Sequence, residues 1–229
     1  MNKITFKVDH TIFQKHPDFR RAIIIAKGVN NKGDLSNEIR REVEQVKRLS
    51  PDDKRLTAWR EAFAREGMKV RDFRPSVDAL VKRIQANKPF GSINPIVDIG
   101  TIVSLKFVLP AGAHPILSDT QEVSLEPANG DEVDTTLDDR SETLSRGEIV
   151  LKDNGRLASR RWVWRQTALS RIGNDTTNFF LNIDALGVTD GHELNEAITC
   201  AQDVIRHTFG IDTKTIILSS HNLEETLEV

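Results

Sequence analysis

Hydrophobic positions along the chain fall into short segments whose spacing predicts strands. Residues 4–8 alternate between apolar and polar side chains, which is typical of a strand with one buried face. Residues 22–29 are almost continuously apolar and predict a strand that is covered on both faces. Apolar runs between turn residues predict further strands at 123–125, 148–151, 157–165, 178–183 and 215–218.

Other apolar residues recur at helical spacing. They predict helices over 36–46, 51–66, 76–84, 95–105 and 194–209. Ser36 and Ser76 are predicted as N-caps, and Pro51 as the first residue of its helix. Residues 190–193 form a capping-box-like start for the last helix. The helix over 95–105 is apolar on all sides, so we expect it near the centre of the molecule.

The composition is that of a folded domain. The chain has 229 residues, of which 38% are hydrophobic and 29% charged, and a formal net charge of −2. This is enough apolar material for one core, and no repeat or linker-like segment divides the chain, so we expect one mixed α/β domain over residues 1–229. The longest apolar run, residues 22–26, is far shorter than the ~20 residues that span a bilayer. Neither a transmembrane helix, a signal peptide nor a membrane partner is expected.

Several kinds of site are excluded by what the sequence lacks. The single cysteine, Cys200, excludes an intramolecular disulfide and a zinc site built on several thiolates. It fits a reducing compartment, and a cytoplasmic protein is expected. The histidines lack zinc-ligand spacing and the glycines lack a phosphate-loop or dinucleotide pattern, so neither a metal nor a cofactor is predicted. The acidic run over 131–139 is interpreted as solvated surface.

The most unusual segment is 156–171, which carries five arginines and two tryptophans. On a regular strand, side chains two apart share a face, so Trp162 and Trp164 lie on one face and Arg165 on the other. Flat tryptophan rings stack on bases, and arginine binds phosphates through a planar fork. The segment therefore suits the end of an RNA. The alternative is that the tryptophans anchor a sheet while the arginine stems cover it.

Several blocks of the sequence resemble a known family. Residues 92–110 (SINPIVDIGTIVSLKFVLP) resemble the NxVVDxTNYVLLELGQP block of the bacterial phenylalanyl-tRNA synthetase β subunit, and residues 150–158 and 174–181 are similar to two later blocks. Residues 74–80 (RPSVDAL) and 160–166 (RRWVWRQ) resemble blocks of freestanding B3/B4-domain proteins. The resemblance implies a mixed α/β fold with curved β-sheets packed against helices. In the synthetase, this module carries the editing site that hydrolyses the ester bond of tRNA mischarged with tyrosine.

The chain departs from the synthetase at two places. Where the synthetase has a glycine-rich GIMGGE segment, residues 161–165 carry large side chains, and Gln166 lies near the position of the acidic residue. The histidine of the QPLHAFD block has no aligned counterpart, because Gly112 falls there and His114 lies two residues on. We therefore expect a narrower and more polar pocket, with a substrate other than a tyrosyl group.

The resemblance implies trans-editing, which is hydrolysis of a mischarged aminoacyl-tRNA ester by a protein without an aminoacylation core. It implies tRNA as the partner and requires no metal or cofactor. Polar groups near the ester are expected from His114, Gln166, Thr177 and Asn178. Phosphate contacts are expected from Arg160, Arg161 and Arg165. Substrate contacts are expected from Arg74, Asn94, Trp162 and Trp164.

Alternative interpretations remain open. Arg74 also fits one half of a structural ion pair, and Asn94 also fits a helix cap. A second hypothesis for the whole protein is a non-catalytic module that binds tRNA or an amino-acid derivative. A weaker third is a small-molecule amidase or esterase. The oligomeric state is not predicted.

Overall fold

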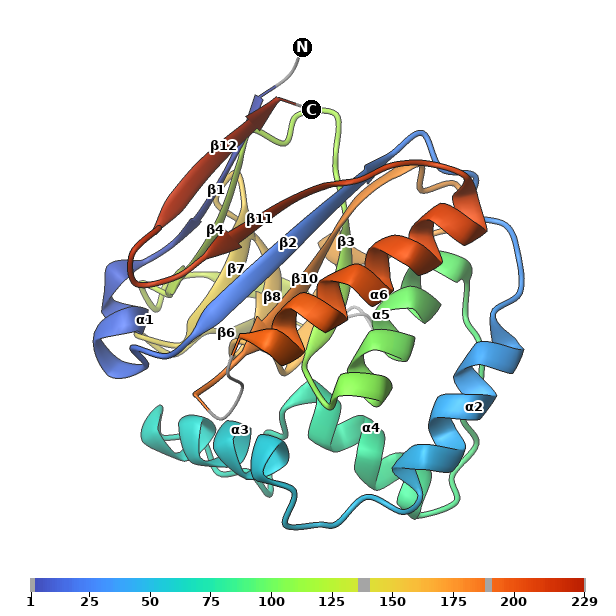
Figure 1. The fold of residues 1–229 in the computed structure, drawn as a ribbon. Coiled ribbons are helices and arrows are strands. Elements are labelled where there is room, and N and C mark those ends of the chain that lie inside the picture. Colours follow the sequence, from blue (N-terminus) through green and yellow to red (C-terminus); the bar gives the residue numbers. More distant parts are fainter. Residues whose placement is uncertain (1–2, 136–140, 188–190, 229) are drawn as a thin grey trace.

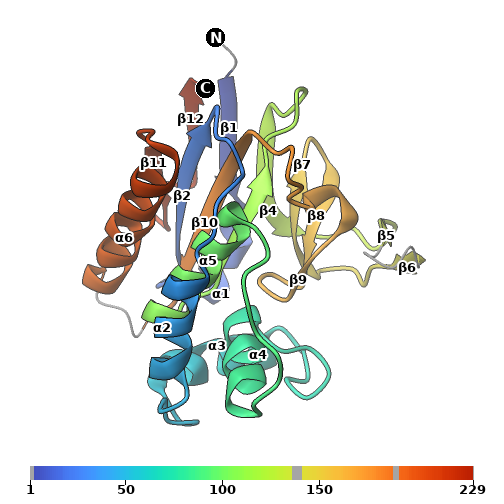
Figure 2. The same cartoon turned by 90° about the vertical axis from the view of Figure 1, so that its right-hand side faces the viewer.

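The described part of the chain forms two large β-sheets, one two-stranded sheet and a layer of helices (Figure 1). The computed structural model describes residues 3–135, 141–187 and 191–228. Turned by 90°, the molecule shows the four-stranded sheet in the middle, with helices on one side and the six-stranded sheet on the other (Figure 2). The mixed α/β architecture predicted from the sequence is confirmed.

The four-stranded sheet is antiparallel throughout. Its strand order is β11 (Lys214–Leu218), β2 (Arg20–Lys27), β10 (Asn178–Ala185) and β3 (Ala111–Pro115). β2 is buried on both faces, as its continuous apolar run predicts. Within β10, Phe180 pairs with Ile25 of β2 on one side and with His114 of β3 on the other. The central strands thus bring residues from three distant parts of the chain into one row.

The six-stranded sheet is formed by strands from both ends of the chain and from its middle. Its order is β12 (Glu224–Glu228), β1 (Lys3–Val8), β4 (Glu122–Pro127), β7 (Ile149–Asp153), β8 (Arg156–Arg160) and β9 (Arg165–Gln166). Only the β1–β4 pair is parallel among these described strands. A hairpin of β5 (Val133–Thr135) and β6 (Ser141–Thr143) projects beside it (Figure 2).

Six α-helices and one short 3-10 helix, η1 (Ala168–Ser170), are described. The α-helices are α1 (His10–Lys15), α2 (Ser36–Val46), α3 (Lys54–Arg65), α4 (Ser76–Gln85), α5 (Pro95–Phe107) and α6 (His192–Phe209). α5 is central and buried over most of its length, as predicted, and Asn94 caps it by accepting a hydrogen bond from the Val97 N–H at 3.1 Å. No described helix combines the length and apolarity needed to cross a bilayer.

Two hydrophobic cores follow from the layers. One core lies between the two large sheets and is closed at one end by α3 and α4. α3 contributes Trp59 and Phe63, and α4 contributes Val77 and Val81. The other lies between the four-stranded sheet and α5 and α6. Because β2 and β10 lie between the two cores, successive side chains of these strands pack alternately into one core and the other. β1 pairs with β4 and β11 pairs with β2, so strands from distant parts of the chain share each sheet. One domain over residues 1–229 stays a prediction.

Three predicted roles at helix starts are wrong, although α2 and α4 begin at the predicted residues 36 and 76. α2 begins at Ser36 itself, whose N–H is bound by Asp34 Oδ1 at 2.8 Å. α3 begins at Lys54 rather than Pro51, because Asp53 accepts a hydrogen bond from the Arg55 N–H. At α4, Ser76 is the first helical residue, and its N–H donates to Val163 O at 2.8 Å. The expected start over 190–193 lies partly outside the described residues, and α6 follows Gly191.

The predicted strand over 157–165 is interrupted. β8 ends at Arg160, the chain turns over 161–164, and β9 begins at Arg165. Arg161 and Trp162 have φ angles of 47° and 61°, in the left-handed region that residues with side chains rarely adopt. The periodicity of the segment does not reveal this turn, because buried tryptophan and valine side chains satisfy a strand and a buried turn equally well.

The acidic run is not simply solvated surface, which corrects the sequence-based interpretation. Asp134 is 1% exposed, and Glu132 accepts a hydrogen bond from the buried Lys152 Nζ at 2.8 Å. These carboxylates balance buried cations of the six-stranded sheet, so the charges of the run are structural. Residues 136–140, which complete most of the run, lie outside the described residues.

Candidate functional site

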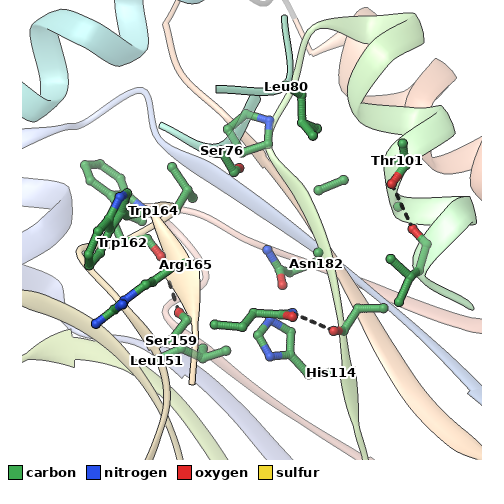
Figure 3. Close-up of a pocket in the computed structure, with 18 of the residues that line it drawn as sticks. Ser76, Leu80, Thr101, His114, Leu151, Ser159, Trp162, Trp164, Arg165 and Asn182 are labelled. Carbon is green, nitrogen blue, oxygen red and sulfur yellow. Dashed lines mark hydrogen bonds between the residues drawn. The ribbon is translucent and has the colours of Figure 1, made fainter. Parts of the chain in front are cut away.

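A pocket of about 230 Å³ opens between the two sheets, at the level of α4 and α5 (Figure 3). Its apolar walls come from α4, α5 and the turn over 161–164, and include Leu80, Val97 and Val163. Most of its polar side chains come from β2, β3, β8, β9 and β10, and α4 and α5 add Ser76 and Thr101. The pocket therefore has apolar walls around a small polar base.

Three polar side chains meet at the base, around Gly112. A Cβ atom on Gly112 would lie 3.6 Å from Gln166 Nε2, 3.7 Å from Asn182 Oδ1 and 3.8 Å from His114 Nε2. The glycine leaves bare backbone beside the three groups, so a ligand can approach them closely. Gln166 is held in place because its Nε2 donates to Ala113 O at 2.6 Å.

His114 is a buried neutral imidazole. Its Nδ1 lies 2.9 Å from Ser170 Oγ, and its ring stacks on Phe180 with centroids 4.9 Å apart. Burial, followed by the nearby charge of Arg21, lowers the pKa of His114 to about 3. At neutral pH, His114 therefore offers hydrogen-bonding nitrogens rather than a charge.

An ion pair and an amide complete the polar base. Arg21 and Asp184 form a buried bidentate pair, with Nε–Oδ1 and Nη2–Oδ2 distances of 2.7 Å. Asn182 Nδ2 donates to Asp184 Oδ2 at 3.3 Å, which turns Asn182 Oδ1 away from the pair. This oxygen is buried without a hydrogen-bond partner, and Figure 3 shows Asn182 near the middle of the pocket. An unpartnered buried acceptor is costly, and a bound donor would satisfy it.

The tryptophan segment forms one wall of the pocket. Trp164 and Arg165 both line it, because the turn over 161–164 breaks the strand alternation that would separate them. The Arg165 guanidinium lies 4.4 Å from the Trp164 ring centre. Trp162 also reaches the pocket, yet it is 1% exposed and packs mainly on Phe19 and Trp59. Trp162 therefore anchors the wall, and Trp164 presents its surface.

The structure brings five of the predicted residues to this pocket: His114, Trp162, Trp164, Arg165 and Gln166. Thr177 and Asn178 do not line it. Asn178 Oδ1 accepts a hydrogen bond from the Gly28 N–H, and Thr177 O accepts one from the Val29 N–H. Both residues hold the end of β10 against the chain that leaves β2, away from the polar base.

Arg74 and Asn94 also lie outside the pocket lining. Arg74 precedes α4, and its Nη1 lies 2.6 Å from Oδ2 of Asp78, which is four residues further along the chain. Asn94 caps α5 and accepts a hydrogen bond from Asn31 Nδ2 at 3.2 Å. The contacts of both residues match the structural interpretations that the sequence left open.

Arg160 occupies a different environment from the one expected for a phosphate-binding residue. Its side chain is 1% exposed, with Nε 2.8 Å from Glu148 Oε1 and Nη1 2.6 Å from Glu142 Oε2. Asp134 Oδ2 lies 3.4 Å from Nη1. A phosphate reaches this guanidinium only by displacing these carboxylates, so Arg160 is a structural residue. Arg161 lies outside the pocket, and Arg165 is shared between the pocket and Asp134.

Sequence reasoning missed Asn182 and Arg21. The available signal was the alternation of β10, where Asn182 and Asp184 interrupt an otherwise apolar strand on one face. A polar pair at period two inside a buried strand indicates a polar site on that face, since isolated polar groups are costly there. Ser76 and Ser159, which also line the pocket, carry no such signal.

No described residues form a cluster of three or more His, Cys, Asp or Glu side chains suited to a metal ion. The polar base of the pocket consists instead of amides, a neutral imidazole and one internally paired guanidinium. These groups donate and accept hydrogen bonds, and they suit a ligand with both donors and acceptors.

Comparisons with known proteins place the chain in a family. No curated protein matches its sequence. A solved structure with a similar arrangement is an N-terminal fragment of the phenylalanyl-tRNA synthetase beta-subunit from Pyrococcus horikoshii, with 13% identity and a TM-score of 0.49. The likeness covers 93% of this chain and 50% of that one, so the chain spans about half the length of the fragment. The B3/4 domain profile matches residues 58–198, which include the pocket-lining segments from Ser76 to Asn182, and the chain therefore belongs to the B3/4 domain family.

Proposed function

We propose that this protein is a trans-editing deacylase, which takes the aminoacyl group of a mischarged tRNA into the pocket and hydrolyses its ester. The observation that carries the proposal is the polar base at Gly112, where Gln166, Asn182 and His114 meet beneath apolar walls. The single cysteine fits a cytoplasmic site of action. Membership of the B3/4 family supports tRNA as the proposed partner.

The size of the pocket favours an aminoacyl group over a nucleotide. A volume of about 230 Å³ lies below the usual range of small-molecule sites, which is roughly 300–1,000 Å³. A single amino-acid side chain fits it, and the ribose and base would remain outside. Trp164 is only partly buried at the wall, where the Arg165 guanidinium lies over its ring, and this pair can contact such an outer group.

The chemistry would depend on positioning. Attack of a water oxygen on the ester carbonyl forms a carbon–oxygen bond, breaks the bond to the ribose oxygen, and returns a proton to that leaving oxygen. Asn182 Oδ1 is free to accept a hydrogen bond from the water, which directs a lone pair at the carbonyl. The second N–H of Gln166 can donate to the developing oxyanion. Fixed groups of this kind lower barriers without themselves gaining or losing protons.

A deacylation screen against a panel of mischarged tRNAs tests the proposal. Gln166→Ala should lower the rate on the active substrate by about 100-fold or more, because one lost oxyanion donor typically costs this much. Asn182→Ala should also lower the rate, because it removes the acceptor that orients the water. tRNA binding should remain. Gln45→Ala, an exposed amide on α2, is the matched control and should leave the rate unchanged. Absence of deacylation across the panel, or full activity in both variants, would refute the proposal.

A second candidate is a non-catalytic module that binds the aminoacyl end of tRNA. It is favoured by His114, whose pKa of about 3 makes it a weak general base at neutral pH. A non-hydrolysable amide analogue of an aminoacyl nucleoside separates the candidates. Tight binding of this analogue, with no turnover of any ester in the panel, would favour the binding module.

A further inference from the structure

A second cavity, the basic cleft, lies next to the turn over 161–164. Its volume is about 440 Å³, nearly twice that of the pocket. It is formed by the ends of α1 and α3, by residues 145–149 before and at the start of β7, and by Phe73 and Arg161. The turn therefore separates two cavities, with Trp164 facing the pocket and Arg161 facing the cleft.

The cleft carries an excess of positive charge. Lys15 is neutralised by Glu66, with a distance of 2.8 Å between Nζ and Oε2. Arg65 and Arg146 also line the cleft, and among the described residues neither has an ion-pair partner. Like charges gathered in a concave surface without counterions attract an anion from solution.

Arg161 lines the cleft, and aromatic rings hold its guanidinium in a fixed position. Its Cζ lies 3.7 Å from the Phe73 ring centre and 4.9 Å from that of Trp164, so two aromatic rings hold it. Its Nη2 is 3.5 Å from Glu148 Oε2, which Arg160 also binds, while its Nη1 is buried without a hydrogen-bond partner. A buried donor without an acceptor is unusual in a folded protein.

The backbone of Arg161 supports the same interpretation. Its φ of 47° is unfavourable for a residue with a side chain, and the next residue also has positive φ. Such conformations persist where the surrounding structure enforces them, and they cluster at ligand sites. Here the strained turn is what directs Arg161 away from the pocket and into the cleft.

We propose that the basic cleft binds the phosphate group of a phosphate ester, with Arg65, Arg146 and Arg161 as its ligands. The two unpaired arginines match the double charge of a terminal phosphate, and a guanidinium fork suits its oxygens. The volume leaves room for the ester group beyond the phosphate. The proposal does not depend on hydrolysis in the pocket. The phosphate comes either from a small nucleotide or from the backbone of an RNA.

Calorimetric titrations with inorganic phosphate, AMP and a short unstructured RNA test the proposal. AMP should bind the unaltered protein, and Arg65→Glu and Arg146→Glu should each weaken binding by about tenfold or more, as expected for a lost charged hydrogen bond. Arg161→Lys keeps the charge but loses the fork, and it should also weaken binding. Arg48→Glu, an exposed arginine that follows α2, is the matched control and should have almost no effect.

The outcomes distinguish the sources of the phosphate. A backbone phosphate is indicated if RNA binds more tightly than AMP and its affinity depends on salt. The slope of log K against log salt concentration should then decrease in magnitude by about one for each arginine removed. Equal binding of AMP and RNA indicates a small phosphate ester. Thermal unfolding of each variant verifies that the protein is folded. Binding of none of the three probes, or equal weakening by Arg48→Glu, would overturn the proposal.

Discussion

The ion pair at the base of the pocket allows a quantitative test of how this site is stabilised. Arg21 is 3% exposed and Asp184 is fully buried, and two hydrogen bonds of 2.7 Å join them. Arg21→Met keeps a long apolar side chain but leaves the Asp184 carboxylate buried without its counterion. Removing one partner of a buried pair typically costs about 3–5 kcal/mol. In a domain of this size each kcal/mol lowers Tm by about 2–4 °C, so a decrease of roughly 6–20 °C is expected.

The double variant Arg21→Met with Asp184→Leu separates the cost of an unpaired charge from the cost of lost packing. It removes both charges, so its free energy of unfolding should return to within about 2 kcal/mol of the original protein. Arg206→Met, at an exposed ion pair on α6, is the control and should cost less than about 0.5 kcal/mol. Urea denaturation and thermal unfolding measure all three. The reasoning is refuted if Arg21→Met costs under about 1 kcal/mol, or if the double variant is no more stable than the single one.

Further predictions concern protonation and packing. The pKa of His114 is about 3 in the folded protein and near 6.5 when unfolded, so this residue contributes stability above pH ~6.5 that is lost as the pH falls toward 3. His114→Asn should therefore flatten the curve of unfolding free energy against pH between these values. An unchanged slope would contradict the buried neutral state of His114. Although burial raises the pKa of Glu132, hydrogen bonds from Lys152 and backbone N–H groups lower it to about 2. The contribution of Glu132 to the free energy of unfolding is therefore present above pH ~4.5 and lost as the pH falls to 2. Glu132→Gln should reduce the acid sensitivity of unfolding between these pH values, as measured by circular dichroism. Trp162→Ala should cost about 3–5 kcal/mol because the ring is fully buried, whereas Trp164→Ala should cost clearly less and enlarge the pocket; equal losses in urea denaturation would contradict this division.

The main strands and helices could be predicted because their signals are local. A continuous apolar run specifies a strand covered on both faces, which is the position of β2 between the two cores. Asn94 followed by Pro95 and an all-round apolar segment specifies the start and the burial of α5. By contrast, β12 has alternating exposed and half-buried residues and no strong apolar run, so only its pairing with β1 makes it a strand.

The candidate site was predicted in part. Trp164 and Arg165 were identified from the composition of their segment, and His114 and Gln166 through the resemblance to B3/B4 proteins; all four line the pocket. Asn182 was missed, although it forms a polar pair at period two with Asp184 in an otherwise apolar strand; only the neighbouring strands show what this pair meets. The adjacent arginines 160 and 161 also differ in a way that spacing alone does not reveal, since Arg160 is enclosed by carboxylates and Arg161 lines the basic cleft.

By itself, the sequence determined the local elements, the family, and the type of residue available for binding. The tertiary structure alone decided which of those residues act together. Gly112, Gln166 and Asn182 lie far apart along the chain and meet only because β3, β9 and β10 converge at one end of the pocket. The turn over 161–164 likewise depends on the packing of Trp162 against Phe19 and Trp59, which holds backbone angles that local preferences disfavour. Side-chain periodicity reports one segment at a time, whereas the pocket and the basic cleft depend on contacts between distant segments.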